Sequence, residues 1–349
     1  MKYRVIQWAT GAMGKSCLRA IIDHPDLELV GLYVYSDSKV GKDAGEIARR
    51  DPTGVSATRD IEKILALEAD LVVHAARIQP PYTHHNESIR RLLSSGKNVI
   101  SINGHSYPQY WGKEYVDEFE TACQTGQSTL FGTGLNPGFI VEKIATTATG
   151  LCSRIDNIFI SEIVECHMVS NPNYVFDVLG FGTKVGSINP NDPAWPSAEI
   201  LNGMYSEVVA HLVNRLGYPL DRVETDHIML PATTDIQMAA GLIKQGTISH
   251  TNWRWHGIVN EKRLVTLSIS WIMEKAHLAK PDYNLWNVHI KGLPGVKIDI
   301  DLEKPADYPY RTGPEELAVA ATVVNSIPAV CKAKPGIMDI PIANHFKTP

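Results

Sequence analysis

The sequence has few cysteines, no long apolar run and no block of like charge. Its 349 residues include five cysteines, widely spaced and without a Cys-x-x-Cys pair, so neither a disulfide framework nor a cysteine zinc site is indicated. No stretch approaches the 18 or so apolar residues that predict a membrane span. The opening MKYRVIQWATGAMG holds an apolar run too short for a signal peptide. We expect a cytoplasmic protein without a membrane partner.

The charges are nearly balanced, with 33 basic and 38 acidic residues and a formal net charge of −5. No basic tail stands out, which argues against nucleic acid and anionic membranes as partners. The 26 glycines and 21 prolines are ordinary for a globular protein and exclude collagen-like and disordered chains. The length suggests about two domains. A chain of this length buries enough surface to fold without disulfides or a structural metal.

Strand-like and helix-like segments alternate through the first 130 residues or so. The strands are expected at 4–8, 27–34, 69–76, 97–102 and 128–131, and the helices at 15–23, 60–68, 84–95 and 115–125. Such alternation implies right-handed crossovers and a parallel sheet covered on both faces. The sequence therefore predicts an α/β domain of the Rossmann type, a doubly wound parallel sheet, over residues 1–150.

After residue 150 the pattern changes to long strands in succession. Strands are expected at 154–168, 223–225, 246–259, 264–273 and 287–302, with a helix at 196–216. This pattern predicts a C-terminal α+β domain on a mostly antiparallel sheet, over 151–311. A last helix at 314–330 is apolar on several sides, so we expect residues 312–349 to return onto the N-terminal domain.

The first strand ends in a turn, Ala9-x-Gly11-x-x-Gly14, that opens the first helix. This is the Gly-x-Gly-x-x-Gly pattern of dinucleotide-binding proteins with alanine at the first glycine. Gly11 would let the backbone approach a pyrophosphate, and Gly14 would allow close packing of helix on strand. The alternative is a tight turn without a ligand. We expect the pyrophosphate to contact Ala9, Thr10, Gly11, Ala12, Met13 and Gly14, with the helix N–H groups facing it.

The end of the second strand predicts the cofactor. An acidic residue at the tip would bind the ribose hydroxyls of NAD, whereas a serine with lysines can accept the 2′-phosphate of NADP. Ser36 is the expected tip residue, followed by Asp37 and by Lys39 and Lys42. We expect NADP, held by Ser36 and Lys39. NAD stays possible, because Asp37 could select it.

Three further loops should border the cofactor, since ligands of open parallel sheets bind beyond the carboxyl ends of the strands. In the loop at 132–139, Asn136 suits a helix N-cap and Pro137 a first helical residue, so a second helix N-terminus would point at the nicotinamide. Simple capping is the alternative for Asn136. The expected cofactor contacts of these loops are Ala75, Ala76, Arg77, Ile102, Asn103 and Asn136.

Six segments together resemble one known family. They are RVIQWATGAMG (4–14), HPDLELVG (24–31), SKVGKDAGE (38–46), GTGLNPGF (132–139), FDVLGFG (176–182) and VNSIPAVCKAKPGI (324–337). The resemblance is to dihydrodipicolinate reductase-like proteins, the group with 2,4-diaminopentanoate dehydrogenase and the native amine dehydrogenases. It implies a Rossmann domain, a C-terminal α+β domain that forms homodimers, and reversible hydride transfer between NAD(P)H and a C=N or C=O carbon.

One loop departs from the amine dehydrogenases in this group. There the loop after the fifth strand resembles S-T-C-E-E-x-S-Y-P, with a glutamate that activates ammonia. This chain reads SINGHSYP at 101–108, one residue shorter and without a carboxylate. The catalytic candidates of the loop are His105, Tyr107 and Asn103. His105 could act as a base and Tyr107 as a donor, whereas Asn103 cannot take a proton. We therefore expect a ketone, an aldehyde or a preformed imine as the substrate equally with an amine.

The substrate wall is expected from both domains. Glu165 and His167, two apart on a strand, should face one side. The candidate substrate contacts are Asn136, Phe139, His167, Tyr174, Phe176 and Asp177, for which core or interface packing is the alternative. No metal is expected, because the His84-His85 pair and His250/His256 lack metal-site spacing. The main alternative in another class is a dinucleotide-binding redox sensor without turnover.

Overall fold

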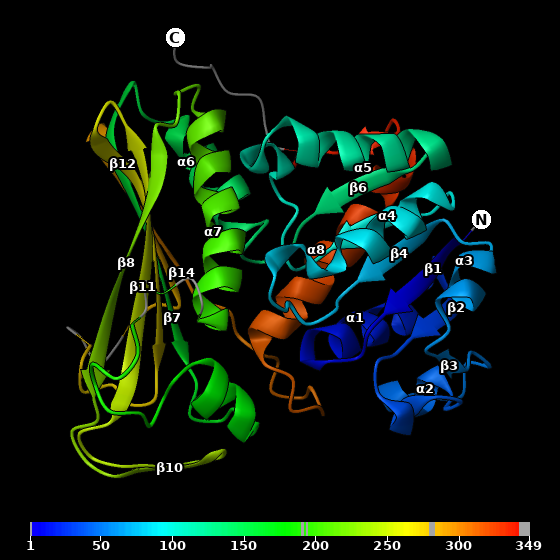
Figure 1. Cartoon of the computed structure of the whole chain (residues 1–349), viewed down its shortest axis with the longest axis horizontal. Helices are drawn as coiled ribbons and strands as arrows, with labels where there is room; N and C mark the ends of the chain where they lie inside the picture. The colour runs from blue at the N-terminus through cyan, green and yellow to red at the C-terminus, as the bar shows by residue number, and fades with distance from the viewer. Residues whose placement is uncertain (1, 190–191, 193–194, 279–282, 342–349) are drawn as a thin grey trace. The chain divides into compact units, whose positions relative to one another are not determined.

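The computed structural model describes residues 2–189, 192, 195–278 and 283–341 (Figure 1). It separates into two compact units. Unit 1 contains Met1–Lys143 and Glu303–Ile342, and unit 2 contains Ile144–Leu302. The chain thus leaves unit 1 once and returns to it. Residues 342–349 of the expected C-terminal tail lie outside the described residues.

Unit 1 is built on a seven-stranded parallel sheet in the order β15-β6-β5-β4-β1-β2-β3. The strands are β1 (Tyr3–Trp8), β2 (Leu27–Tyr33), β3 (Ala57–Thr58), β4 (Leu71–His74), β5 (Asn98–Ser101), β6 (Thr129–Gly132) and β15 (Gly336–Ile337). The order reverses at β1, which pairs with β2 on one side and β4 on the other. In doubly wound sheets such a reversal opens a crevice beyond the carboxyl ends of the strands. The predicted α/β domain is confirmed.

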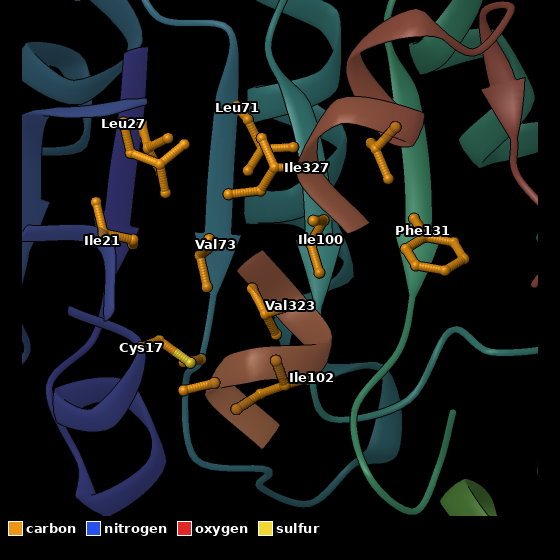
Figure 2. Close-up of a cluster of buried hydrophobic side chains, with 14 of the residues drawn as sticks. Cys17, Ile21, Leu27, Leu71, Val73, Ile100, Ile102, Phe131, Val323 and Ile327 are labelled. Atoms are coloured by element: carbon orange, nitrogen blue, oxygen red, sulfur yellow. The ribbon is translucent and has the colours of Figure 1, made fainter. Parts of the chain in front are cut away.

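Helices cover both faces of this sheet. They are α1 (Ala12–Asp23), α2 (Ala44–Ala48), α3 (Ile61–Ala66), α4 (Asn86–Ser94), α5 (Lys113–Gly126) and α8 (Pro314–Lys332). On one face, Cys17 and Ile21 of α1 and Val323 and Ile327 of α8 pack on β-strand residues such as Val73 (Figure 2). On the other face, α3, α4 and α5 bury a second cluster. The helix at the end of the chain is therefore part of the N-terminal core.

The edge strand β15 was not predicted. It has two residues, too few for any alternating pattern, and Gly336 has a φ of 138°. It is held by tertiary contacts: Gly336 N donates to Ser128 O at 3.0 Å, and Ile337 N donates to the Glu120 carboxylate at 3.0 Å. β3 was missed for the same reason of length.

Unit 2 is built on a six-stranded sheet in the order β14-β13-β7-β12-β11-β8. Its strands are β7 (Arg154–Glu165), β8 (Arg222–Pro231), β11 (Ile248–Val259), β12 (Lys262–Ile272), β13 (Trp286–Leu293) and β14 (Val296–Ile300), antiparallel except for the parallel pair β7–β12. Helix α7 (Pro196–Arg215) packs on one face, where Asn202 accepts a 2.9 Å hydrogen bond from Trp255. The predicted, mostly antiparallel α+β region is confirmed. A small hairpin of β9 (Ile236–Met238) and β10 (Gly241–Ile243) and the short α6 (Thr146–Thr149) complete the unit.

Three strand predictions in unit 2 are wrong in extent. The strand expected at 223–225 is β8, which continues to Pro231. The strand expected at 154–168 ends at Glu165, and a turn follows. The strand expected at 287–302 is the hairpin of β13 and β14, because Pro294 and Gly295 reverse the chain between them. Among the described residues, no helix combines the length and apolar character needed to cross a membrane.

Candidate functional site

The turn between β1 and α1 is shaped to leave room at its surface. Ala9 is buried with a φ of 73°, and Gly11 is the N-cap residue of α1. A Cβ built on Gly11 would meet no atom within 4 Å, whereas one on Gly14 would lie 2.4 Å from Ala9 O. Gly14 is therefore required for the turn to pack, and Gly11 leaves open space above it. The close packing predicted at Gly14 is observed, and the approach of a pyrophosphate at Gly11 stays a prediction.

The N-terminus of α1 fits an anion. No side chain caps it, and its first turn holds no acidic residue. Ala12 is exposed and Met13 is half-buried against the core, while Thr10 is buried beneath the turn. Free N–H groups and the helix dipole at such an end favour a phosphate. The residues at 9–14 therefore suit the pyrophosphate of a dinucleotide.

The loop after β2 carries the charges that the sequence singled out. Lys39 does not extend into solvent: its Nζ donates to Thr10 O at 3.1 Å and to Thr10 Oγ1 at 2.8 Å. Burial, and then the charge of Lys15, lower the pKa of Lys39. Ser36 Oγ lies 2.8 Å from Ser38 Oγ, and the Asp37 carboxylate forms an ion pair with Arg59. Here Asp37–Lys39 forms the short helix η1.

The loops after β4 and β5 are tied together. Asn103 Nδ2 donates to Ala76 O, so its side chain bridges the two loops. Ala75 N bonds to Trp8 O at 2.9 Å, and Ile102 N to His74 O at 3.2 Å. Ala75, Ala76 and Ile102 are buried, whereas the Arg77 side chain is exposed. Between the loops lies the short helix η2 (Tyr82–His85).

His105 is enclosed within unit 1. It is 4% exposed and has a φ of 61°. Its Nε2 lies 3.1 Å from Asn86 Oδ1, and its Nδ1 lies 3.1 Å from Ser101 Oγ. A neutral ring can form both hydrogen bonds, because Nε2–H can donate to the Asn86 oxygen while Nδ1 accepts from the Ser101 hydroxyl. Burial, and then the neighbouring His85, lower its pKa to about 4. A ring in this environment is neutral at pH 7 and holds the loop in place.

Tyr107 lies beside the returning C-terminal segment. It is half-buried and precedes the short helix η3 (Pro108–Trp111). Burial raises the pKa of Tyr107, and the charge of Asp339 raises it further. The phenol is therefore protonated at neutral pH and able to donate.

The loop after β6 corrects one prediction. Asn136 does not cap a helix, because Gly138 has a φ of 124° and the first helical element is the π-helical turn η4 (Ile140–Ala145). The chain instead closes on Leu135 O, which accepts from the Phe139 and Ile140 amides at 3.0 and 2.9 Å. Glu142, fully buried, accepts from Gly138 N at 2.9 Å. Phe139 is exposed beside Lys143.

The remaining predicted site residues belong to unit 2. His167 was expected on a strand, which is wrong, because it lies in the turn beyond β7; its Nδ1 is nonetheless 3.4 Å from Glu165. Glu165 also accepts from Tyr283 and pairs with Lys275 at 3.0 Å. Tyr174, Phe176 and Asp177 lie on η5 (Asn173–Val178), where Phe176 packs on Gly182 and Gly241, and Asp177 accepts from Asn173 at 2.9 Å.

Sequence reasoning missed several members of these groups. Arg59 gave no signal, since it follows a strand of two residues. Asn86 and Ser101, which hold His105, are ordinary helix and strand residues in the sequence. Lys275 and Tyr283 are distant in sequence from Glu165, and they come from the segment between β12 and β13 to contact it. Among the described residues, no group of three or more His, Cys, Asp or Glu could hold a metal ion.

Known proteins are similar to this chain over part or all of its length. Residues 5–100 match the family model of the N-terminus of dihydrodipicolinate reductase. An amine dehydrogenase of Streptomyces virginiae is 28% identical over 355 residues, covering 97% of this chain and 96% of that protein. A 2,4-diaminopentanoate dehydrogenase of Acetoanaerobium sticklandii is 22% identical, covering 98% of this chain and 94% of that protein.

A solved structure shares the fold. The amine dehydrogenase from Mycobacterium smegmatis superposes with a TM-score of 0.78 at 19% identity, covering 97% of this chain and 95% of that one. The likeness therefore extends through both units, and the open turn at 9–14 lies within the region matched by the reductase family. The chain is an NAD(P)-dependent oxidoreductase that is similar to dihydrodipicolinate reductase in its N-terminal part, and to an amine dehydrogenase and a 2,4-diaminopentanoate dehydrogenase over nearly its whole length.

Proposed function

We propose that the chain uses NADPH for hydride transfer at a C=O or C=N carbon of a small or moderately apolar substrate. The observation that carries the proposal is the open turn at 9–14, set at the N-terminus of α1 and at the reversal of the strand order. When bound, the cofactor supplies the hydride from its nicotinamide ring. The chain supplies binding, orientation and protons.

Each loop has a proposed task in holding the cofactor. The residues at 9–14 bind the pyrophosphate, and Ser36 and Lys39 stand at the adenosine ribose. Ala75, Ala76, Arg77, Ile102, Asn103 and Asn136 border the rest of the cofactor. The bridge from Asn103 to Ala76 supports this assignment, because it fixes the two loops beyond β4 and β5 to each other.

We propose Tyr107 as the proton donor to the reduced oxygen or nitrogen. Tyr107 is half-buried in the loop after β5, and its phenol, protonated at neutral pH like that of any tyrosine, has a proton to donate. His105, a candidate from sequence, is proposed instead to position the loop, because its buried ring is bonded at both nitrogens. Tyr107→Phe should lower turnover about 100-fold while leaving the Kd for NADPH unchanged. Equal turnover in wild type and variant would remove Tyr107 from the chemistry.

The residues that contact the substrate are proposed for each unit by itself. Phe139 in unit 1, and His167, Tyr174, Phe176 and Asp177 in unit 2, are proposed to contact the substrate. The loop at 101–108 holds no carboxylate to activate ammonia, so carbonyl reduction and amine chemistry are both within the proposal. Ketone turnover measured with and without ammonium separates them. Equal ketone consumption without ammonium, giving alcohol, would assign carbonyl reduction.

Cofactor binding is the direct test of the proposal. The purified chain is titrated with NADPH and with NADH, following the quenching of tryptophan emission and the rise in melting temperature. A ligand at 100 times its Kd should stabilise the folded state by about 2.7 kcal/mol. Failure of both nucleotides to bind would reject the proposed function. Binding without turnover on a broad panel of ketones, aldehydes, imines and amines would favour the redox sensor.

We also propose that the chain forms homodimers through unit 2. The sheet of unit 2 is covered by α7 on the face of Trp253 and Trp255. Its opposite face, by strand alternation, carries Phe159 and Ile228, which are 37% and 38% exposed. Exposed apolar side chains on an otherwise polar sheet face suit contact with the same face of a second copy of the chain.

A further inference from the structure

We infer that Arg59 is the residue that selects NADPH over NADH, by exchanging its ion pair with Asp37 for the 2′-phosphate. The inference rests on the proposed function, since it concerns the adenosine end of the same site. Ser36 and Lys39 were the residues expected there from sequence. Arg59 lies 22 positions beyond Asp37 along the chain, so only the folded sheet brings it to this end.

The parallel pairing of β3 with β2 places Arg59. Thr58 is the register partner of Tyr33, and Val34 N donates to Thr58 O at 2.9 Å. Arg59 therefore leaves the sheet beside the residues that follow β2, and its guanidinium reaches the Asp37 carboxylate. Asp37 is the acidic residue that could bind the ribose hydroxyls of NAD. In the structure that carboxylate is already paired with the Arg59 guanidinium.

The ion pair between Arg59 and Asp37 is open to a ligand. The Arg59 side chain is 48% exposed and the Asp37 side chain is 87% exposed. An exposed pair of this kind is weak, because water and salt screen it. A phosphate dianion offers the guanidinium more charge and a bidentate geometry. Asp37 can return to water when the exchange occurs, so it needs no new partner.

Neighbouring groups favour the same ligand. Lys39 is held on Thr10, between the tip of β2 and the pyrophosphate turn, and Lys15 is close enough to lower its pKa. Ser36 and Ser38 add hydroxyl groups beside Asp37. Arg59, Lys15 and Lys39 carry three positive charges, and Asp37 carries the one negative charge among these residues. The balance of charge suits a 2′-phosphate better than an uncharged ribose hydroxyl.

Two substitutions separate the roles of the pair. Arg59→Ala should weaken NADPH binding roughly 10- to 100-fold and leave NADH binding equal or tighter, because Asp37 is then released for the ribose hydroxyls. Asp37→Asn should tighten NADPH binding several-fold, because the guanidinium no longer has a competing partner. Arg90→Ala is the control, since it breaks another surface ion pair, with Glu118, on α4 and α5.

The adenosine end can be tested without turnover. The full chain and its variants are titrated by calorimetry with 2′,5′-ADP and with 5′-AMP, which differ by the 2′-phosphate. We expect wild type and Arg90→Ala to prefer 2′,5′-ADP and Arg59→Ala to lose that preference, with melting temperatures unchanged. An unchanged preference in Arg59→Ala would overturn the inference. Wild type that binds neither NADPH nor NADH would instead reject the proposed function.

Discussion

At the scale of single residues, Gly11 and Gly14 form a matched pair in one turn. A Cβ on Gly14 would lie 2.4 Å from Ala9 O, so Gly14→Ala should cost about 1–3 kcal/mol of unfolding free energy. Gly11→Ala places its Cβ in open space and has an ordinary φ of −66°, so the fold should be unaffected. Its methyl group would occupy the proposed phosphate position, and NADPH affinity should fall about tenfold. Urea unfolding and fluorescence titration measure the two effects.

The result that would contradict this prediction is a reversal of the two effects. If Gly11→Ala unfolds more easily and binds NADPH normally, the open space at Gly11 is not the phosphate position. Equal losses of stability and affinity in both variants would mean that the turn acts only as a structural element.

His105 gives a prediction about pH. Its pKa in the folded protein is about 4, below the 6.5 of an ordinary histidine, so the unfolded chain binds the proton more tightly. The stability that the neutral ring provides is complete above pH 6.5 and is lost as the pH falls toward 4. Between pH 7 and pH 5 the loss is about 2 kcal/mol. His105→Gln should remove that part of the pH dependence of urea unfolding.

The pH dependence of kcat tests whether His105 positions the loop or transfers a proton. A positioning role predicts no ionisation of this ring between pH 5 and 8 in the pH profile of kcat. If a limb near pH 6.5 is present in wild type and absent in His105→Gln, the ring takes part in proton transfer. An identical slope of stability against pH in both proteins would show that the ring titrates normally.

At the scale of elements, the aromatic ring of Tyr310 attaches the segment before α8 to the rest of unit 1. Tyr310 lies between two guanidinium groups, with Arg19 at 4.7 Å and Arg50 at 4.6 Å from its ring centre. Arg19 also donates to Thr312 Oγ1 at 3.0 Å, and Arg50 is paired with Asp23. The returning segment therefore attaches to α1 and to the loop after α2 before α8 begins.

Removal of this ring should loosen the attachment. Tyr310→Ala should lower the unfolding free energy by about 1–2 kcal/mol and speed amide exchange at the start of α8, since two cation–π contacts are lost. Tyr310→Phe keeps the ring and should behave as wild type within about 0.5 kcal/mol. A loss as large in Tyr310→Phe would assign the stabilisation to the hydroxyl group, which lies 3.4 Å from Arg49 O.

At the scale of the whole molecule, the proposal of a homodimer predicts the oligomeric state in solution. Ile228→Lys adds a charge to the sheet face opposite α7 and should shift the mass measured by light scattering from dimer to monomer. Leu151→Lys is the control, because Leu151 is 67% exposed in a loop that precedes β7. A monomeric wild type, or dimers that persist in Ile228→Lys, would exclude this face as the interface.

The sequence by itself determined those features that depend on neighbours along the chain. Strand–helix alternation predicted the parallel sheet of unit 1, and the spacing of Gly11 and Gly14 predicted the tight turn between β1 and α1, because both patterns reflect local backbone geometry. Long successive strands likewise predicted the sheet of unit 2. Local turn chemistry was less reliable: Asn136 and Pro137 suit a helix start, yet the loop closes on Leu135 O instead.

Only the tertiary structure decided which side chains share an environment. Arg59 reaches Asp37 because β3 pairs with β2, and His105 is enclosed because Asn86 and Ser101 come from two other elements. The strand β15 exists only because the edge of β6 accepts it. Burial, desolvation and ion pairing depend on contacts between distant segments, and these set the protonation of His105 and the charge at the end of β2.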